Sequence, residues 1–143
     1  MKPLRTSFVL AVPDAKATAR WWVDVMGFEL YQEPGGWGFV RRGPCSLLLG
    51  SCPDAINPRD LGDHQYFAYI EIDDVDAYHA EISARGAEVL FPPMNQTWGM
   101  REMGVRTPDG HRLMLAQRIE SQSAAVKKRA IASAAGPTRR GSS

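Results

Sequence analysis

Two segments of the sequence follow one pattern, and this internal repeat constrains the fold more than any other feature. Each copy starts with a short apolar run that ends at an Asp, continues with helical spacing, and reaches a Gly before a new apolar run. The first copy has Asp14 and Gly27 at these points, and the second has Asp74 and Gly86. Such an ordered repeat predicts two copies of one supersecondary unit.

The Asp and the Gly of each copy mark the two ends of an expected helix. A carboxylate at the N-cap accepts hydrogen bonds from free backbone N–H groups, which suits Asp14 and Asp74. Glycine tolerates the positive φ with which many helices end, which suits Gly27 and Gly86. Apolar residues between these points recur at helical spacing, clearly in the first copy and less regularly in the second.

Two further strands are expected in the second half of each copy. In the first copy they cover residues 36–41 and 45–50, with a turn-like Arg-Gly-Pro between them. In the second copy they cover residues 100–106 and 112–117, separated by Thr-Pro-Asp-Gly, which is a strong turn signal. Each unit is therefore predicted to be β-α-β-β-β, and the fold class to be α+β.

The length of 143 residues suits one domain of this kind followed by a tail. We expect the domain to cover residues 1–118, with modules at about 5–52 and 65–118. Residues 119–143 are rich in Ala, Ser, Lys and Arg and hold few large apolar side chains. We expect this tail to be disordered or partly helical, with one frayed helix over residues 124–135.

Charge is distributed unevenly along the chain. The 17 Lys and Arg against 16 Asp and Glu give a formal net charge of +1. From Arg118 onward six basic residues accompany a single acid, Glu120, so this tail carries +5 and the body before it −4. A mildly acidic body argues against nucleic-acid binding, which needs a basic stripe facing the phosphates. A nucleic-acid or partner arm in the tail is the less favoured alternative to a solvated tail.

The sequence predicts a cytoplasmic protein that is not associated with a membrane. No apolar run approaches the roughly 18–20 residues that cross a bilayer, and the N-terminus lacks the pattern of a signal peptide. Cys45 and Cys52 match no zinc or redox motif and cannot form a disulfide framework.

Three stretches of the repeat are similar to one known family. They are residues 21–28 (Trp-Trp-Val-Asp-Val-Met-Gly-Phe), residues 73–77 with 84–87 (Asp-Asp-Val-Asp-Ala and Ala-Arg-Gly-Ala), and residues 98–102 running on to Pro-Asp-Gly-His at 108–111. Together they resemble the vicinal oxygen chelate superfamily, which contains glyoxalase I, bleomycin-resistance proteins and extradiol dioxygenases. The resemblance covers residues 7–117. It implies two βαβββ modules that form a cupped mixed sheet, with helices on the convex face and the ligand on the concave face.

Metal-using members of this superfamily hold one divalent ion with His, Gln or Glu side chains from the first and fourth strand of each module. The resemblance places these four positions at Ser7, Leu48, Phe67 and Met114. Leu, Phe and Met offer no oxygen or nitrogen to such an ion, and a lone Ser hydroxyl is a poor ligand. We therefore expect no metal at the usual site and no other cofactor.

No other residues in the sequence form a recognisable catalytic centre. The histidines, His64, His79 and His111, lie in different expected elements, which favours surface or structural roles. Acids at residues 73–76 are explained by a capped helix. No GxSxG, P-loop or GxGxxG motif is present in the sequence.

Apolar and aromatic side chains remain on the expected concave face. The predicted ligand-binding residues are Trp37, Phe39, Leu48, Phe67, Tyr69, Glu71, Trp98, Met100, Glu102, Arg112 and Met114. Core packing is the alternative for each aromatic residue. As a set they suit a planar, apolar or cationic small molecule, with Trp37 and Trp98 as the leading stacking contacts. The candidate polar anchors are Glu71, Arg101, Glu102 and Arg112.

Three functions stay open at this point. The favoured one is a non-catalytic, metal-independent binding protein that resembles bleomycin-type drug-binding and antibiotic-resistance proteins. The second is an enzyme of the same superfamily, such as a glyoxalase-like lyase or isomerase or a dioxygenase-like enzyme, that uses a displaced carboxylate base such as Glu71 or Glu102. The third is an interaction subunit without a small ligand. We also expect a two-fold homodimer, because open sheet edges and an open cup are usually covered.

Overall fold

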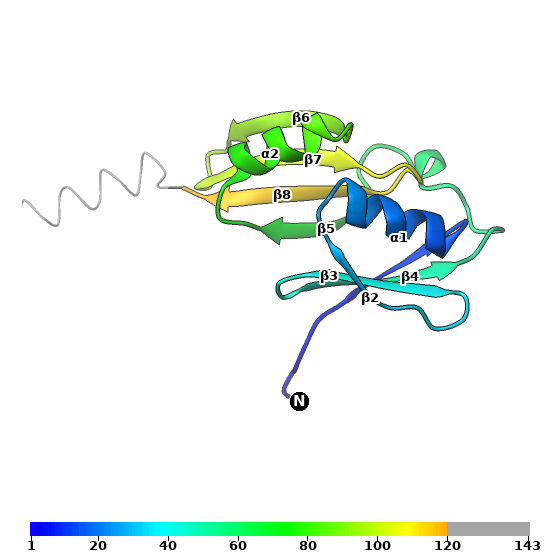
Figure 1. Ribbon diagram of the computed structural model, residues 1–143. Coiled ribbons are helices and arrows are strands. Elements are labelled where there is room, and N and C mark those ends of the chain that lie inside the picture. The colour runs from blue at the N-terminus through cyan, green and yellow to red at the C-terminus, as the bar shows by residue number, and fades with distance from the viewer. Residues whose placement is uncertain (120–143) are drawn as a thin grey trace, which may run out of the picture.

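The computed structural model describes residues 1–119 and confirms the α+β fold of two βαβββ modules (Figure 1). The first module consists of β1 (Phe8–Val12), α1 (Ala15–Asp24), β2 (Glu29–Gln32), β3 (Trp37–Arg42) and β4 (Cys45–Ser51). The linker holds a short 3-10 helix, η1 (Pro58–Leu61). The second module consists of β5 (Tyr66–Glu71), α2 (Val75–Ala84), β6 (Glu88–Asn95), β7 (Met100–Arg106) and β8 (Arg112–Arg118). The predicted helix at 124–135 and the tail from residue 120 onward lie outside the described residues.

Each module forms a four-stranded mixed sheet. The strand orders are β1-β4-β3-β2 and β5-β8-β7-β6. In both sheets the first strand runs parallel to the last, with Val9 opposite Leu48 in one and Tyr69 opposite Met114 in the other. The remaining neighbours are antiparallel. The repeat in the sequence is therefore a repeat of topology.

The predicted helix ends are confirmed. The Asp14 carboxylate accepts hydrogen bonds from the backbone N–H of Lys16 at 3.0 Å and of the residue after it, and Asp74 accepts one from Ala77 at 3.0 Å. Gly27 and Gly86, which follow the two helices, have φ of +74° and +87°. Residues with a side chain rarely adopt such backbone angles, which explains why a glycine stands at both positions.

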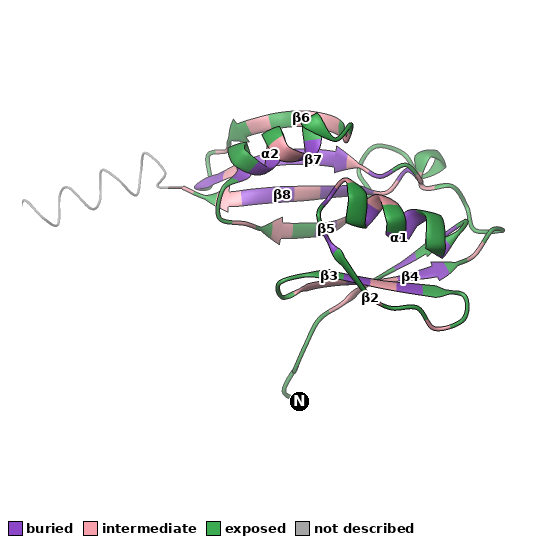
Figure 2. Cartoon of the chain, in the orientation of Figure 1, coloured by how far each residue is buried: buried purple, intermediate pink, exposed green. Residues whose placement is uncertain are grey.

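Each helix covers one face of its own sheet and leaves the other face open. Helix α1 packs on β2, β3 and β4, and α2 packs on β6, β7 and β8 (Figure 1). Buried side chains lie on the strand faces under the helices and between the modules, whereas α1 and α2 are exposed on their outer sides (Figure 2). The helix-free faces are the surfaces on which a ligand or a partner can act.

One apolar core joins the two modules. Trp22 of α1 is fully buried, and its ring packs edge-on against Phe28 at 4.8 Å and Phe67 of β5 at 6.5 Å between centroids. The Tyr78 hydroxyl of α2 donates a hydrogen bond to the backbone carbonyl of Met26 at 2.7 Å. Contacts of this kind across the modules fix how the two sheets are placed.

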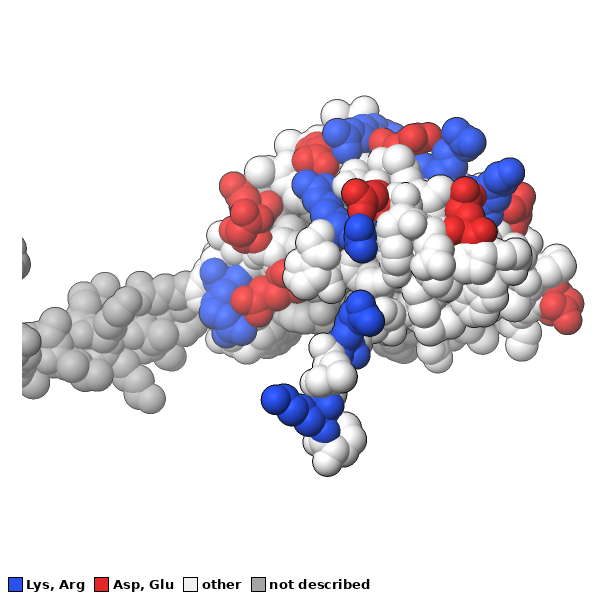
Figure 3. Space-filling model, turned by 60° about the horizontal axis from the view of Figure 1, so that its bottom comes forward, with Lys and Arg blue, Asp and Glu red and all other residues white. Residues whose placement is uncertain are grey.

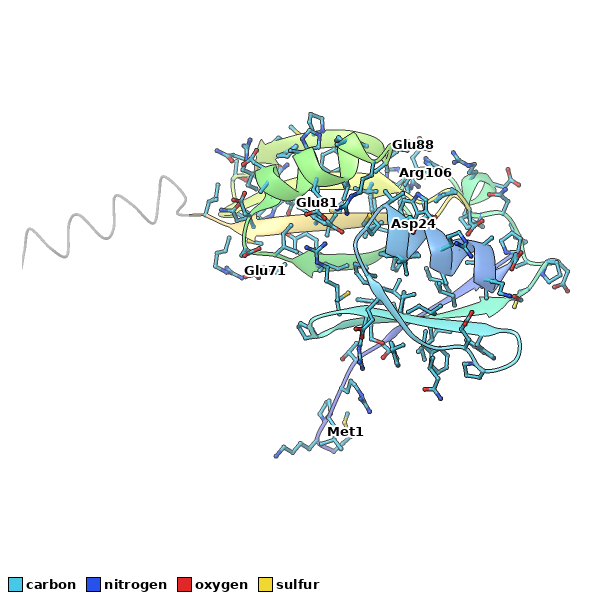
Figure 4. The ribbon with its side chains drawn as sticks, in the orientation of Figure 1. Met1, Asp24, Glu71, Glu81, Glu88 and Arg106 are labelled. Carbon is cyan, nitrogen blue, oxygen red and sulfur yellow. The ribbon has the colours of Figure 1, made fainter. Side chains whose placement is uncertain are left out.

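Ion pairs surround this junction on the surface. Glu81 of α2, which Figure 4 labels, accepts from Arg42 of β3 at 3.2 Å and from Arg85 at 3.1 Å. On the second module Glu88 lies beside Arg106 at 3.6 Å (Figure 4). A partly exposed pair such as Glu81–Arg42, which joins the modules, contributes about 0–1 kcal/mol, so the apolar core rather than this ion pair holds the modules together.

Two further features concern the setting of the protein. Within the described residues no helix is both long and apolar enough to cross a bilayer. Cys45 and Cys52 are free thiols in the structure.

We expect His111 to make the stability of this junction sensitive to pH. Its ring lies edge-on to Phe67 at 6.0 Å between centroids, and burial lowers the pKa of the imidazole below 6.5, against a smaller opposing effect of Asp109. Below about pH 6.5 the unfolded chain therefore binds a proton that the folded chain does not, so the free energy of unfolding should fall as the pH drops through this window.

Urea unfolding at about pH 7.5 and about pH 5.5 measures this effect. The variant His111→Gln should lose less stability than the parent protein between the two pH values. An equal loss in both proteins would show that other groups cause the pH dependence.

Candidate functional site

The second sheet carries a hollow on the face that points away from α2. Arg101 of β7 marks the face under α2, because its guanidinium pairs with Asp76 in the first turn of that helix at 2.9 Å. Side chains alternate along a strand, so Glu102 points to the open face. The hollow has a volume of about 630 Å³, which is in the range of small-molecule sites. We call it the Glu102 pocket; its lining is Tyr69, Phe91, Met94, Gln96, Trp98, Glu102 and Met114.

Glu102 is the charged residue of this lining and is held by two neutral donors. Only 4% of the residue is exposed. The Tyr69 hydroxyl donates to Oε2 of Glu102 at 2.5 Å, and Nε1 of Trp98 donates to the same oxygen at 2.9 Å. These bonds hold the carboxylate in the wall of the pocket and orient both rings around it.

Tyr69 is protonated beside this carboxylate. Burial, followed by the hydrogen bond to Glu102, raises the pKa of the Tyr69 phenol to about 12. The phenol therefore keeps its proton at neutral pH and acts as a hydrogen-bond donor.

The outer wall of the pocket comes from β6, an edge strand interrupted by two adjacent prolines. Prolines are tolerated at a sheet edge, and here the register of β6 on β7 shifts around them. As a result Phe91 lies opposite Gly104. A Cβ atom at Gly104 would lie 2.4 Å from the Phe91 ring, so the missing side chain is what allows this ring to rest on the strand.

Trp98 lies in the turn between β6 and β7. The backbone N–H of Gly99 donates to the carbonyl of Gln96 at 3.4 Å, and Gly99 has a φ of +85°. A glycine at this position permits the tight turn. The indole is 64% exposed and lies within hydrogen-bonding reach of β7, so it offers a ring face to a ligand.

The structure brings four of the predicted ligand-binding residues together in this pocket. They come from β5, the β6–β7 turn, β7 and β8, and are Tyr69, Trp98, Glu102 and Met114. Two carboxylates, Glu71 and Glu102, were predicted as possible general bases. Of these two, Glu102 lies in this aromatic-lined pocket. The role of these residues as ligand contacts stays a prediction.

Three predicted contacts lie on the other module. Trp37, Phe39 and Leu48 occupy the open face of the first sheet, because Gly38 between the two aromatic residues faces Ala19 of α1. The two rings are 6.1 Å apart between centroids. Trp37 borders a different hollow, beside the start of α1. The two tryptophans predicted as leading contacts therefore do not meet within one chain.

Phe67 corrects the strand alternation assumed for β5. The ladder with β8 is irregular between Tyr66 and Ala68, so Phe67 occupies a bulge. Its ring packs edge-on against Phe8 at 5.8 Å between centroids and belongs to the core between the modules. The prediction that Phe67 shares a face with Tyr69 is wrong for this reason.

Two of the predicted polar anchors hold the fold instead of facing the pocket. Arg101 pairs with Asp76 under α2, so its prediction as an anchor in the cup is wrong. Arg112 is 6% exposed, and its guanidinium donates to the backbone carbonyl of Gly62 in the linker. Arg112 therefore ties the linker to β8.

Glu71 and Met100 complete the predicted set and lie outside the lining of the pocket. Glu71, the last residue of β5 and labelled in Figure 4, pairs with Arg118 at 3.0 Å. Met100 is 6% exposed at the start of β7. Of the two carboxylates predicted as bases, Glu71 is thus neutralised by an arginine, whereas Glu102 is not.

Three lining residues escaped the sequence analysis, namely Phe91, Met94 and Gln96. They belong to β6 and to the turn that follows it, for which no face was predicted. The adjacent prolines signal an irregular edge strand, and Gly104 signals a close approach. A register shift cannot be read from simple alternation, which is why these residues were missed.

The side chains at the family's usual metal positions do not fit a divalent cation. Leu48 and Met114 lie on β4 and β8, the last strands of their modules. Phe67 lies at the bulge of β5, and Ser7 precedes β1. Ser7 alone offers an oxygen, and a single hydroxyl is too weak a donor set. Within residues 1–119 no three His, Cys, Asp or Glu side chains gather into a group.

These features define a protein of two βαβββ modules with an apolar pocket on the open face of one sheet. The sequence profile of the Glyoxalase/Bleomycin resistance protein/Dioxygenase superfamily matches residues 6–115. The chain belongs to this superfamily, as the resemblance implied.

Solved structures agree with this assignment. A bleomycin-binding protein complexed with bleomycin is 22% identical, with a TM-score of 0.68 over 81% of this chain and 99% of that one. TnmS3, an antibiotic-binding protein from Streptomyces sp. CB03234, is 25% identical, with a TM-score of 0.61 over 82% and 99%. TioX from Micromonospora sp. ML1 is 22% identical, with a TM-score of 0.66 over 82% and 100%. No protein with a curated function matches the sequence.

Proposed function

We propose that this protein is a metal-independent binding protein for planar, largely apolar small molecules, and that it acts in the cytoplasm in drug or antibiotic resistance. The observation that carries the proposal is the Glu102 pocket, where Trp98 is 64% and Tyr69 47% exposed. Aromatic rings left open to solvent in a concave site suit stacking on a flat ligand. The similarity to a bleomycin-binding and an antibiotic-binding protein supports the proposed role in drug or antibiotic binding.

A screen of planar aromatic drugs and metabolites by quenching of intrinsic tryptophan fluorescence tests the proposal. We expect saturable quenching by at least one member of the set, because Trp98 lies in the pocket and a stacked ring quenches its emission. Quenching should be reduced in Trp98→Phe while binding, followed by calorimetry, persists. No binding by any compound would leave the proposal without support.

Metal independence is a prediction with its own measurement. Because Leu48, Phe67 and Met114 supply no oxygen or nitrogen ligands, the purified protein should hold no stoichiometric divalent metal after dialysis without chelator. Elemental analysis checks this. About one Zn, Ni, Fe or Mn per chain, lost when a side chain of either open face is replaced, would contradict it.

We further propose a two-fold homodimer that completes the pocket. The open face of the first sheet leaves Val9 63% and Trp37 41% exposed beside Phe39 and Leu48. Figure 3, which brings the bottom of the Figure 1 view forward, shows a broad area without charged side chains and charges around it. Apolar patches of this kind mark interaction surfaces. The first sheet of one protomer facing the second sheet of its partner gives two composite pockets.

Light scattering at micromolar concentration should report twice the chain mass of 15.8 kDa. Val9→Glu places a charge on the proposed interface and should shift the mass to that of a monomer. Val23→Glu, at a 36% exposed position on α1, is the matched control and should leave the dimer intact. A monomeric parent protein would overturn the assembly.

A further inference from the structure

The Glu102 pocket contains a buried carboxylate without a cationic partner in the described part of the chain. Glu102 is 4% exposed, and none of the ion pairs among residues 1–119 includes it. Its hydrogen bonds come from a phenol and an indole, which bring no positive charge. Burying a charge is costly unless an opposite charge accompanies it. The protein therefore leaves a position that a ligand can neutralise.

The rest of the pocket lining also favours a positively charged ligand. Tyr69 and Trp98 present ring faces around the carboxylate, and such faces attract cations. The lining contains no Lys or Arg that could fill this role. The nearest strand acid on the same face, Glu71, is already paired with Arg118 at 3.0 Å. Negative potential in the pocket is thus concentrated at Glu102.

We propose that the pocket selects ligands that carry a protonated amine, with the ammonium on the Glu102 carboxylate and the flat body stacked on Trp98. This inference rests on the proposed function and narrows its ligand class. An anionic ligand would be repelled by the carboxylate, and a neutral one would leave it unpaired. A divalent metal ion in place of the amine would find a single carboxylate, the amide of Gln96, a phenol that keeps its proton and an indole, which is a poor oxygen donor set.

A matched pair of probes tests the proposal on the full chain. 1-Naphthylmethylamine and 1-naphthylmethanol share the ring and have similar size, but only the first is charged at neutral pH. An NMR titration that follows the indole N–H signal of Trp98 gives both dissociation constants, because this group donates directly to Glu102. A charge-assisted hydrogen bond in a buried site should favour the amine by at least about tenfold.

Two variants locate the effect. Glu102→Gln keeps an oxygen that accepts from Tyr69 and Trp98 but removes the charge, so it should weaken amine binding at least about tenfold and alter alcohol binding by less than about threefold. Glu71→Gln is the control, because it removes an acid of the same sheet face outside the lining. Because the Glu71 charge is paired with Arg118 and lies outside the lining, this variant should change the affinity for either probe by less than about threefold.

The outcomes separate this inference from the proposed function. Equal binding of amine and alcohol to the parent protein overturns the amine selectivity and leaves the planar-ligand function standing. If neither probe binds and the fluorescence screen is negative, both the amine selectivity and the planar-ligand function are overturned. The comparison of amine and alcohol uses only the parent protein, so it tests the proposal even if a variant folds poorly. An equal loss of amine binding in Glu71→Gln and Glu102→Gln also overturns it, since general surface charge then explains the preference.

Discussion

Replacing Trp22 with Ala is expected to lower the free energy of unfolding by about 3–5 kcal/mol. The indole is fully buried and contacts both Phe28 of its own module and Phe67 of the other, so its loss opens a cavity where the modules meet. No hydrogen bond is lost with it, because Nε1 of Trp22 has no partner among the described residues. The expected effect is therefore one of packing. Urea unfolding followed by circular dichroism measures it.

Trp21 is the matched control for this substitution. It is the neighbouring residue on α1, has the same side chain, and is only partly buried while its ring packs edge-on against Trp22 at 5.4 Å. Trp21→Ala should cost less than half as much stability as Trp22→Ala. Equal losses would show that the junction between the modules does not depend on the buried ring.

The fold could be predicted from the sequence because its signals are local. Asp14 and Asp74 cap helices through bonds to residues two or three positions away, and Gly27 and Gly86 adopt the positive φ that their position demands. Such interactions depend on neighbours in the chain, so the repeat of local signals was enough to give the order of the elements.

The pocket could be predicted only in part because strand faces depend on register. Alternation correctly placed Tyr69 and Met114 on one face of the sheet, where the β5–β8 ladder is regular and the structure pairs the two residues. It failed at Phe67, where one extra residue in β5 turns the side chain toward the core. It gave nothing for Phe91, whose position follows from a second shift around the prolines of β6. Each failure lies at an irregularity that no periodic pattern contains.

The distribution of the tryptophans follows from the same physics. Trp22 lies at helical spacing on the buried face of α1, whereas Trp98 lies in a turn and keeps 64% of its surface in solvent. Because most of the Trp98 side chain is open to solvent while its N–H donates to a buried carboxylate, we predict that this ring serves a ligand and not the core. This contrast leads to opposite expectations for the two residues.

Trp98→Ala is expected to weaken the binding of a planar ligand by at least about 1 kcal/mol, which is about a fivefold loss of affinity, while changing thermal stability little. The affinity falls because the largest ring face of the pocket is removed. The stability is largely kept because most of that ring contacts solvent, and only its hydrogen bond to Glu102 is lost. Calorimetric titration with a ligand from the fluorescence screen and a thermal melt of the same samples give both quantities. A stability loss of about 3–5 kcal/mol with unchanged affinity would identify Trp98 as a plug of the sheet face.

Trp37→Ala extends this test to the assembly. Trp37 lies on the other module and borders a different hollow of the same chain, so within a monomer its removal should not change affinity for the Glu102 pocket. In the proposed homodimer the first sheet of the partner faces this pocket. Trp37→Ala alone should then weaken ligand binding, as Trp98→Ala alone does. Measured on dimeric protein, an affinity unchanged by Trp37→Ala but reduced by Trp98→Ala would confine the ligand to one protomer and exclude the composite pocket.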